Sequence, residues 1–270
     1  MARERKVSIA IIGKTKQFTD SITRSSKVLN KFGNIAAGIG KATAAGLGVA
    51  TVAAATAGRE IVNLASDANE ARSAFETTFG KAVPELSGFV DDFANKAGLA
   101  AFELEGLLTQ SGAVLQGIEF TAEGSADLSQ KLATLAGDVA SFSNVQGGAQ
   151  PVLEAFTKAL LGERESLKTF GIAILEADVQ QQAFIMTGKT SAKELTKQEK
   201  ALATYELLLQ KTKVQQGDLN RTQESFANKS REATAKLKEL KVQMGNELLP
   251  IAEAMLPVLM EFVAALSPAI

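Results

Sequence analysis

The sequence predicts a mainly all-α protein: an elongated helical and coiled-coil chain with a short N-terminal strand and a small central helical domain. Three observations support this fold class. Ala, Leu, Glu, Lys and Gln, which are strong helix formers, dominate the second half of the 270 residues. Only 5 Pro interrupt the chain. Apolar residues recur at steps of three and four along much of it, which is the spacing of one helix face.

The composition excludes several kinds of chemistry. The chain contains no His, Cys or Trp. Without His there is no Ser-His-Asp triad, and without His and Cys there is no zinc site built from nitrogen and sulfur ligands. A net charge of −1 argues against nucleic-acid binding driven by bulk charge. We therefore expect no catalytic residues, no cofactor and no metal, and a protein that is not an enzyme.

Residues 1–32 are predicted to form a strand-helix segment. Val7–Ile12 is rich in β-branched residues and ends at Gly13, which predicts a strand. An amphipathic helix is expected over residues 20–31.

Residues 33–58 are nearly all Ala, Gly, Thr, Val and Ile, with Lys41 as the only charge. The uncharged part, about 17 residues, is at the lower limit for spanning a bilayer. Small residues also let helices pack closely. Two interpretations stay open: a tightly packed helix, or a segment able to enter a membrane. The candidate residues for either role are Ala42, Gly46, Gly48, Val49, Val52 and Gly58.

Residues 59–188 predict a central helical domain made of short helices. Their apolar spacing and their Gly and Pro residues set the expected bounds. The helices are expected near 86–97 with Gly98 as the stop, 104–115, 128–142, and 151–160 with Pro151 in the first turn.

Residues 189–249 predict long charged helices with coiled-coil character. Ser191 and Thr196 each begin a capping box, so the start of the first helix is open by one turn. After a break at Gly217-Asp218, one helix is expected over 219–249. In the apolar segment 250–270, Pro250 and Pro257 are expected to kink or break the helix. The uncapped apolar end suggests a truncated piece of a longer protein.

A seam of apolar residues is predicted along the last long helix. Its members alternate mostly in steps of three and four, with one four-four step at Met244 to Leu248 beside Gly245. We interpret the seam as a candidate self-association face. It consists of Phe226, Ala233, Leu237, Leu240, Met244, Leu248, Ile251 and Met255, and continues to Val258 and Phe262. The nearby basic cluster of Lys229, Arg231, Lys236, Lys238 and Lys241 is interpreted as a solvated face, because Glu232 and Glu239 are interleaved with it.

The order of these features resembles the N-terminal part of the tail tape measure proteins of long-tailed bacteriophages and prophages. The resemblance spans most of the chain. Its most specific part is the run Ala159-Leu160-Leu161-Gly162-Glu163-x-Glu165-x-Leu167-Lys168-x-Phe170-Gly171-Ile172. Further matching motifs are Phe75-x-x-x-Phe79-Gly80, Gly217-Asp218, Thr222-x-x-Ser225-x-Ala227-Asn228 and Gly245-x-x-Leu248-Leu249-Pro250.

This resemblance implies a structural virion protein. Such a protein forms a coaxial helical homo-oligomer in the lumen of the tail tube, and its length sets the tail length. The implied partners are the major tail tube protein, tail assembly chaperones and distal tail or baseplate proteins. The host membrane is met on infection, and DNA is only a passing cargo.

Two alternatives remain open at this stage. The apolar segment 33–58 and the apolar C-terminal end also suit a membrane-active helical protein, of a pore-forming or holin-like kind. An intracellular helical adaptor without a phage connection is the other.

Overall fold

The computed structural model describes the backbone of residues 47–266 and, within it, the side chains of residues 58–250 and of Ala252 and Glu253. The regular elements of this part are all helical, and no strand occurs in it. The prediction of a mainly all-α chain is therefore confirmed. The predicted strand at Val7–Ile12 and the predicted helix at 20–31 lie outside the described residues.

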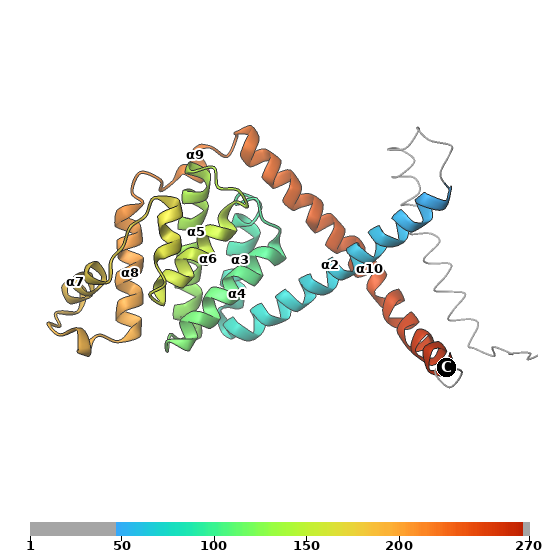
Figure 1. The fold of residues 1–270 in the computed structure, drawn as a ribbon, viewed down its shortest axis with the longest axis horizontal. Helices are drawn as coiled ribbons and strands as arrows, with labels where there is room; N and C mark the ends of the chain where they lie inside the picture. Colours follow the sequence, from blue (N-terminus) through green and yellow to red (C-terminus); the bar gives the residue numbers. More distant parts are fainter. Residues whose placement is uncertain (1–46, 267–270) are drawn as a thin grey trace, which may run out of the picture. The chain divides into compact units, whose positions relative to one another are not determined.

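The helices follow one another with short connections (Figure 1). Their bounds are α2 Leu47–Phe79, η1 Gly80–Ala82, α3 Val83–Phe93, α4 Ala101–Gly117, α5 Ala122–Phe142, α6 Ala149–Leu160, η2 Glu165–Phe170, α7 Glu176–Thr187, η3 Ala192–Glu194, α8 Lys197–Lys211, α9 Asp218–Arg221 and α10 Phe226–Leu266. The chain divides into two compact units, Leu64–Gln243 and the remainder, Met1–Asn63 with Met244–Ile270. We call Leu64–Gln243 the helical domain.

The helical domain is built around α5, which packs against α4, α6 and α9. The predicted stripe of Leu128, Leu132, Leu135 and Val139 is buried along this helix. Phe75, Phe79 and Phe156 are the largest side chains that are fully buried, together with Leu residues from α3, α4 and α6. The helices predicted near 86–97, 104–115, 128–142 and 151–160 correspond to α3, α4, α5 and α6.

The ambiguous helix start is settled at Thr196. Its hydroxyl accepts the N–H of Glu199 at 3.1 Å, and the Glu199 carboxylate accepts the N–H of Thr196 at 2.8 Å. This reciprocal pair is the capping box of α8. Ser191 precedes only the short η3 and makes no side-chain cap bond. Helix α8 packs on α7 and α6, so residues grouped in sequence with the long charged helices lie inside the helical domain.

Two predictions about the last helix are wrong. The helix expected from Leu219 begins instead at Phe226, after the four-residue α9, because Ser225 caps the N–H of Asn228 at 3.3 Å. The helix does not break at Pro250 or Pro257, since α10 continues to Leu266, and the kink that was the other expectation stays a prediction. Each proline removes only one helix hydrogen bond, and strong helix formers such as Ala, Leu, Met and Glu surround both.

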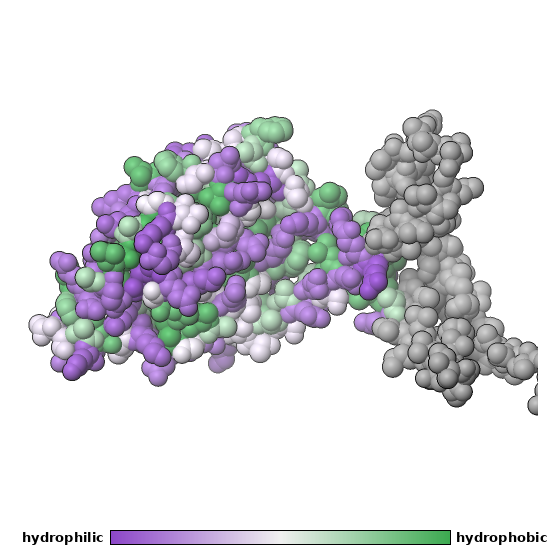
Figure 2. All heavy atoms as spheres, in the orientation of Figure 1, coloured by the Kyte–Doolittle hydropathy of each residue, from purple (hydrophilic) through white to green (hydrophobic). Residues whose placement is uncertain are grey.

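Hydrophilic and hydrophobic side chains are interspersed over the face of the helical domain seen in Figure 2. Across residues 47–266, no helix combines the length and the apolar character needed to cross a bilayer.

Candidate functional site

The N-terminal half of α10 docks on the helical domain mainly through polar groups. Arg231 donates to the side-chain oxygen of Asn144 at 2.6 Å, and Lys238 pairs with Glu103 at 2.5 Å. The Asn228 amide donates to the hydroxyl and the carbonyl of Thr222, both at 3.0 Å. Ala235 is the one buried apolar residue of this half among the described side chains. One face of α10 is therefore committed to intramolecular contact.

The start of α4 supplies the anchor for this face. The Glu239 carboxylate from α10 accepts the N–H of Ala101 at 3.2 Å, and Glu103 accepts the N–H of Ala100 at 3.0 Å. Both carboxylates lie at the N-terminus of α4, where free N–H groups and the helix dipole favour negative charge. Helix α10 thus caps α4 from outside.

A close approach at Gly98 makes this docking sterically feasible. Gly98 has φ +74°, and a Cβ built on it would lie 2.5 Å from Cβ of Arg231. The turn between α3 and α4 therefore requires glycine for its backbone conformation and for contact with α10. The sequence pattern predicts Gly98 as a helix stop but gives no sign of its contact with Arg231.

The predicted seam lies on the opposite face of α10. Phe226, Leu237 and Leu240 are 90%, 56% and 53% exposed, and Ala233 is exposed too. Met244 and Leu248 are partly buried, and the side chains of Ile251 and Met255 are outside the described set. Spacing at about 100° per residue puts the seam opposite Ala235. The exposed part of the seam is available for a partner, and self-association through it stays a prediction.

The residues of the basic cluster lie on two different faces of α10, one that contacts the helical domain and one that is exposed. Arg231 and Lys238 bond to the helical domain, so the interpretation of the whole cluster as a solvated face is wrong for them. Lys229 and Lys236 are exposed and pair with Glu224 and Glu232 on their own side of the helix. Exposed pairs of this kind contribute little and exchange readily. The helical wheel places Lys229, Lys236 and Lys241 beside the seam.

Asp138 on α5 fixes the corner that leads into α10. Its carboxylate accepts the N–H of Gly217 at 2.8 Å and the N–H of Leu219 at 3.1 Å, and the residue is only 8% exposed. These bonds satisfy free donors at the start of α9. The sequence predicts the break at Gly217-Asp218 but not the role of Asp138, because a single Asp within an apolar helix pattern gives no sign of a partner 79 residues away.

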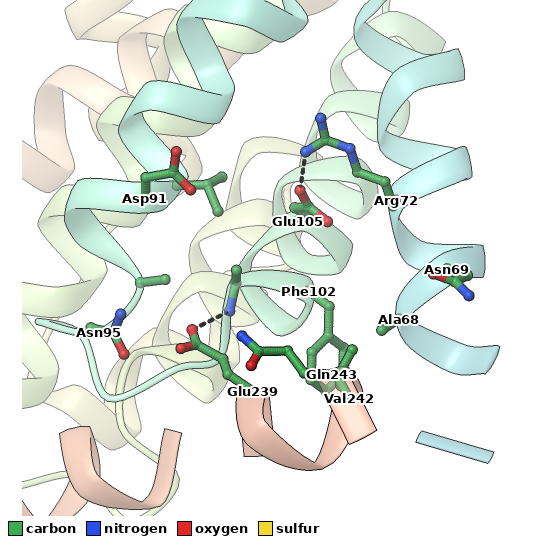
Figure 3. A pocket seen from close by; sticks show the side chains of 13 residues that line it. Ala68, Asn69, Arg72, Asp91, Asn95, Phe102, Glu105, Glu239, Val242 and Gln243 are labelled. Carbon is green, nitrogen blue, oxygen red and sulfur yellow. Dashed lines mark hydrogen bonds and ion pairs between the residues drawn. The ribbon is translucent and has the colours of Figure 1, made fainter. Parts of the chain in front are cut away.

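A polar cleft of about 400 Å³ lies where α2, α3, α4 and α10 meet within the helical domain (Figure 3). Arg72 on α2 donates to Glu105 on α4 at 2.5 Å. Asp91 of α3 and Asn95 of the turn after α3 line the other side. Glu239 lies at the bottom of the same view, bonded to the α4 backbone.

The ion pair in this cleft is asymmetric. The Glu105 side chain is 8% exposed and that of Arg72 is 43% exposed. Burial raises the pKa of Glu105, although the hydrogen bond from Arg72 opposes that shift. The hydrogen bond to Glu105 is the main cause that raises the pKa of Arg72. The ion pair thus links α2 to α4, and the buried Glu105 carboxylate is stable in its charged form only while Arg72 is bonded to it.

The described residues bring no three His, Cys, Asp or Glu side chains into an arrangement that could hold a metal ion. In the polar cleft, the buried carboxylate of Glu105 is bound by the guanidinium of Arg72. Asp91 and Asp92, which follow one another on α3, are both exposed.

The candidate packing or membrane residues are only partly described. Ala42 and Gly46 lie outside the described residues. Gly48, Val49 and Val52 lie in α2, but their side chains are not among those described. A Cβ on Gly58 would meet no atom within 4 Å, so close packing in the described chain does not require glycine there.

Comparison with known proteins identified no matching family model, no matching curated protein and no matching solved structure.

Proposed function

We propose that this chain is part of a phage or prophage tail tape measure protein, a helical ruler in the lumen of the tail tube. The observation that supports this most is α10, one continuous helix of 41 residues whose predicted seam is exposed in its N-terminal half. At 1.5 Å per residue it spans about 60 Å. A continuous helix converts residue number into length, which is what a ruler needs.

In this proposal the chain self-associates as a coaxial helical bundle through the seam. The major tail tube protein polymerises around it, tail assembly chaperones hold it beforehand, and distal tail or baseplate proteins contact one end. Release on infection brings it to the host membrane and helps DNA pass. The role is structural and uses no catalytic residue or cofactor.

The helical domain limits which residues act as the ruler. Helices α3 to α9 fold back on one another, so residues in that domain do not each add 1.5 Å while it stays folded. The span is therefore assigned to α10 and to the helical chain beyond the domain.

Tail length tests the proposal. Four heptads of strong helix formers inserted after Leu266, in the phage or prophage that encodes the chain, should lengthen tails by about 42 Å. The matched control places the same number of Gly and Ser residues after Gly188, in the connection between α7 and α8, and should leave tails unchanged. Unchanged tails with the first insertion would refute the ruler.

The same insertion variants, together with the purified chain, distinguish the ruler from the alternative of a membrane-active protein. Leakage of liposomes caused by the purified chain, together with tails whose length is unchanged by the insertion, would favour a pore-forming or holin-like role.

A further inference from the structure

The connection between α6 and α7 is part of the folded helical domain, and the ruler leaves it without a role. Helix α6 ends in a Schellman motif, in which the N–H of Glu163 donates to the carbonyl of Lys158 at 3.1 Å. Gly162 in this turn has φ +103°, a conformation that residues with a Cβ rarely adopt. The turn brings Arg164 beside the start of α7, where its Nη1 donates to the Glu176 carboxylate at 2.8 Å.

The guanidinium of Arg164 is buried with few acceptors. The side chain is 11% exposed, and its Nε is buried without a hydrogen-bond partner among the described residues. A guanidinium carries five N–H donors, and the bond to Glu176 uses one of them. Because a buried charged donor without an acceptor is unfavourable, an acceptor that reached this group would stabilise it.

A hollow of about 360 Å³ lies beside Arg164, and we call it the basic hollow. Lys197 and Lys200 of α8 line it together with Arg164, and Glu176 is the only carboxylate among the described residues of its lining. Three cations against one carboxylate give the lining a net charge of +2. Lys200 lies 3.5 Å from Glu176, whereas the exposed side chain of Lys197 has no polar partner in the described part of the chain.

The carboxylate in the lining of the basic hollow is already bonded. Glu176 accepts a hydrogen bond from Arg164 at 2.8 Å and one from Gln180 at 3.2 Å. Burial would raise the pKa of Glu176, but these two bonds and the charges of Arg164 and Lys200 outweigh burial and lower the pKa. Glu176 therefore stays ionised and orients Arg164 and Lys200 without contacting Lys197.

The rest of the basic hollow is apolar. Ile118 and Leu160 are buried and contribute to its lining, and Leu161 contributes a side chain that is 50% exposed. Its volume is within the range of about 300–1,000 Å³ that is typical of small-ligand sites. Cations next to an apolar wall suit a ligand that carries an anionic group beside an apolar one.

We propose that the basic hollow binds a short acidic segment of a partner protein, with a Glu or Asp carboxylate between Arg164 and Lys197 and an apolar side chain against Leu161. A small rotation of the guanidinium brings its N–H groups to the carboxylate, which supplies the missing acceptor. Lys197 gains a counter-charge at the same time. The inference goes beyond the ruler, since it gives the folded helical domain a partner of its own.

A protein segment suits this site better than the backbone of a nucleic acid. The apolar wall at Leu161 offers no contact to phosphate or sugar. A second hollow that Arg164 also lines has Glu163 and Glu165 in its wall, and these carboxylates would repel a phosphate chain that continued past the site.

Fluorescence anisotropy of the full chain with a labelled peptide tests this assignment. The probe is a short peptide in which Leu and Glu alternate, and the control peptide has Gln in place of each Glu. We expect the Glu peptide to bind about tenfold more tightly, because a hydrogen bond between a guanidinium and a carboxylate is charge-assisted.

Variants of the chain locate the binding site. Lys197→Gln breaks no described contact within the fold and should weaken binding of the Glu peptide by about threefold. Lys211→Gln is the matched control, because Lys211 is exposed at the other end of α8 and does not line the basic hollow. Arg164→Gln should weaken binding by about tenfold, and Arg164→Lys should recover only part of it, since Lys keeps the charge without the planar fork. Leu161→Ser should weaken binding of both peptides.

Three outcomes would overturn the inference. Equal binding of the Glu and Gln peptides would mean that the site does not recognise a carboxylate. Equal effects of Lys197→Gln and Lys211→Gln would place the peptide elsewhere on the chain. Inorganic phosphate that displaced the peptide at a lower concentration than acetate does would assign the basic hollow to a phosphate group instead. None of these measurements involves tails, so their failure is distinct from failure of the ruler.

Discussion

Replacement of Asp138 should release the corner between α9 and α10. Its carboxylate accepts two backbone N–H bonds, from Gly217 at 2.8 Å and from Leu219 at 3.1 Å, and it is buried. A hydrogen bond to a charged group contributes about 1.5–3 kcal/mol net, and two that share one acceptor group contribute less than twice that. We therefore expect Asp138→Ala to lower the free energy of unfolding by about 2–4 kcal/mol.

Asp138→Asn separates the two bonds, because its amide oxygen can still accept one N–H while its NH₂ group opposes the other. About half of the loss is expected, or about 1–2 kcal/mol. Urea unfolding measures both variants, and hydrogen exchange should show lost protection at Gly217 and Leu219. Asp127→Ala is the matched control on the same helix, since its pair with Lys131 is exposed and is worth about 0.5 kcal/mol or less. Equal losses for Asp138→Ala and Asp127→Ala would refute the reasoning.

Two further stability predictions use the same unfolding measurement. Arg72→Met should cost about 1–3 kcal/mol by leaving the buried Glu105 carboxylate without its partner, and Glu105→Gln in that background should recover most of it. Burial raises the pKa of Glu105 in the folded state, and without Arg72 nothing opposes that shift, so as pH falls Glu105 becomes protonated in the folded variant before it does in the unfolded chain. The stability difference between Arg72→Met and the natural chain should therefore shrink as pH falls from about 7 to about 5. A difference that does not change with pH would exclude this cause. Gly112→Ala should cost about 1–3 kcal/mol, since its Cβ would lie 2.4 Å from Cζ of Phe79, whereas Gly106→Ala meets nothing within 4 Å and should stabilise α4 by about 0.5–1 kcal/mol. Similar effects of the two alanines would show that contact with Phe79 does not decide the difference.

Local patterns were sufficient to predict the presence of α3, α4, α5 and α6, but α7 and the short α9 were not predicted. The steps of three and four in Leu128, Leu132, Leu135 and Val139 place one face of α5 in the core. The pattern predicts Gly98 as the stop of a helix over 86–97, but α3 ends at Phe93, and Gly98, with φ +74°, lies in the turn that follows.

Long-range polar contacts were not predictable in the same way. Glu239 and Asp138 accept backbone N–H groups of other helices, and Glu103 pairs with Lys238 of α10. Periodicity says nothing about such partners. The sorting of Arg231 and Lys238 to the docked face likewise depends on which side of α10 meets α4. Apolar spacing predicted the seam, but only packing shows that the exposed side of α10 is the one with the seam.

The prolines in α10 show where a local rule fails. The missing N–H and the steric clash of proline predict a helix end at Pro250, yet the residues around it sustain the helix to Leu266. The rule describes the free energy that proline costs at its own position, but it leaves out the free energy that the helix-forming residues on both sides contribute to the helix.

The slope of tail length against inserted helical length is the most direct test of the central claim. Insertions of one, two and four heptads after Leu266 should lengthen tails in proportion, at about 1.5 Å per inserted residue. Electron micrographs of tails from each strain supply the lengths. A slope of zero, or an equal slope for unstructured Gly and Ser insertions, would contradict the account of this chain as a helical ruler.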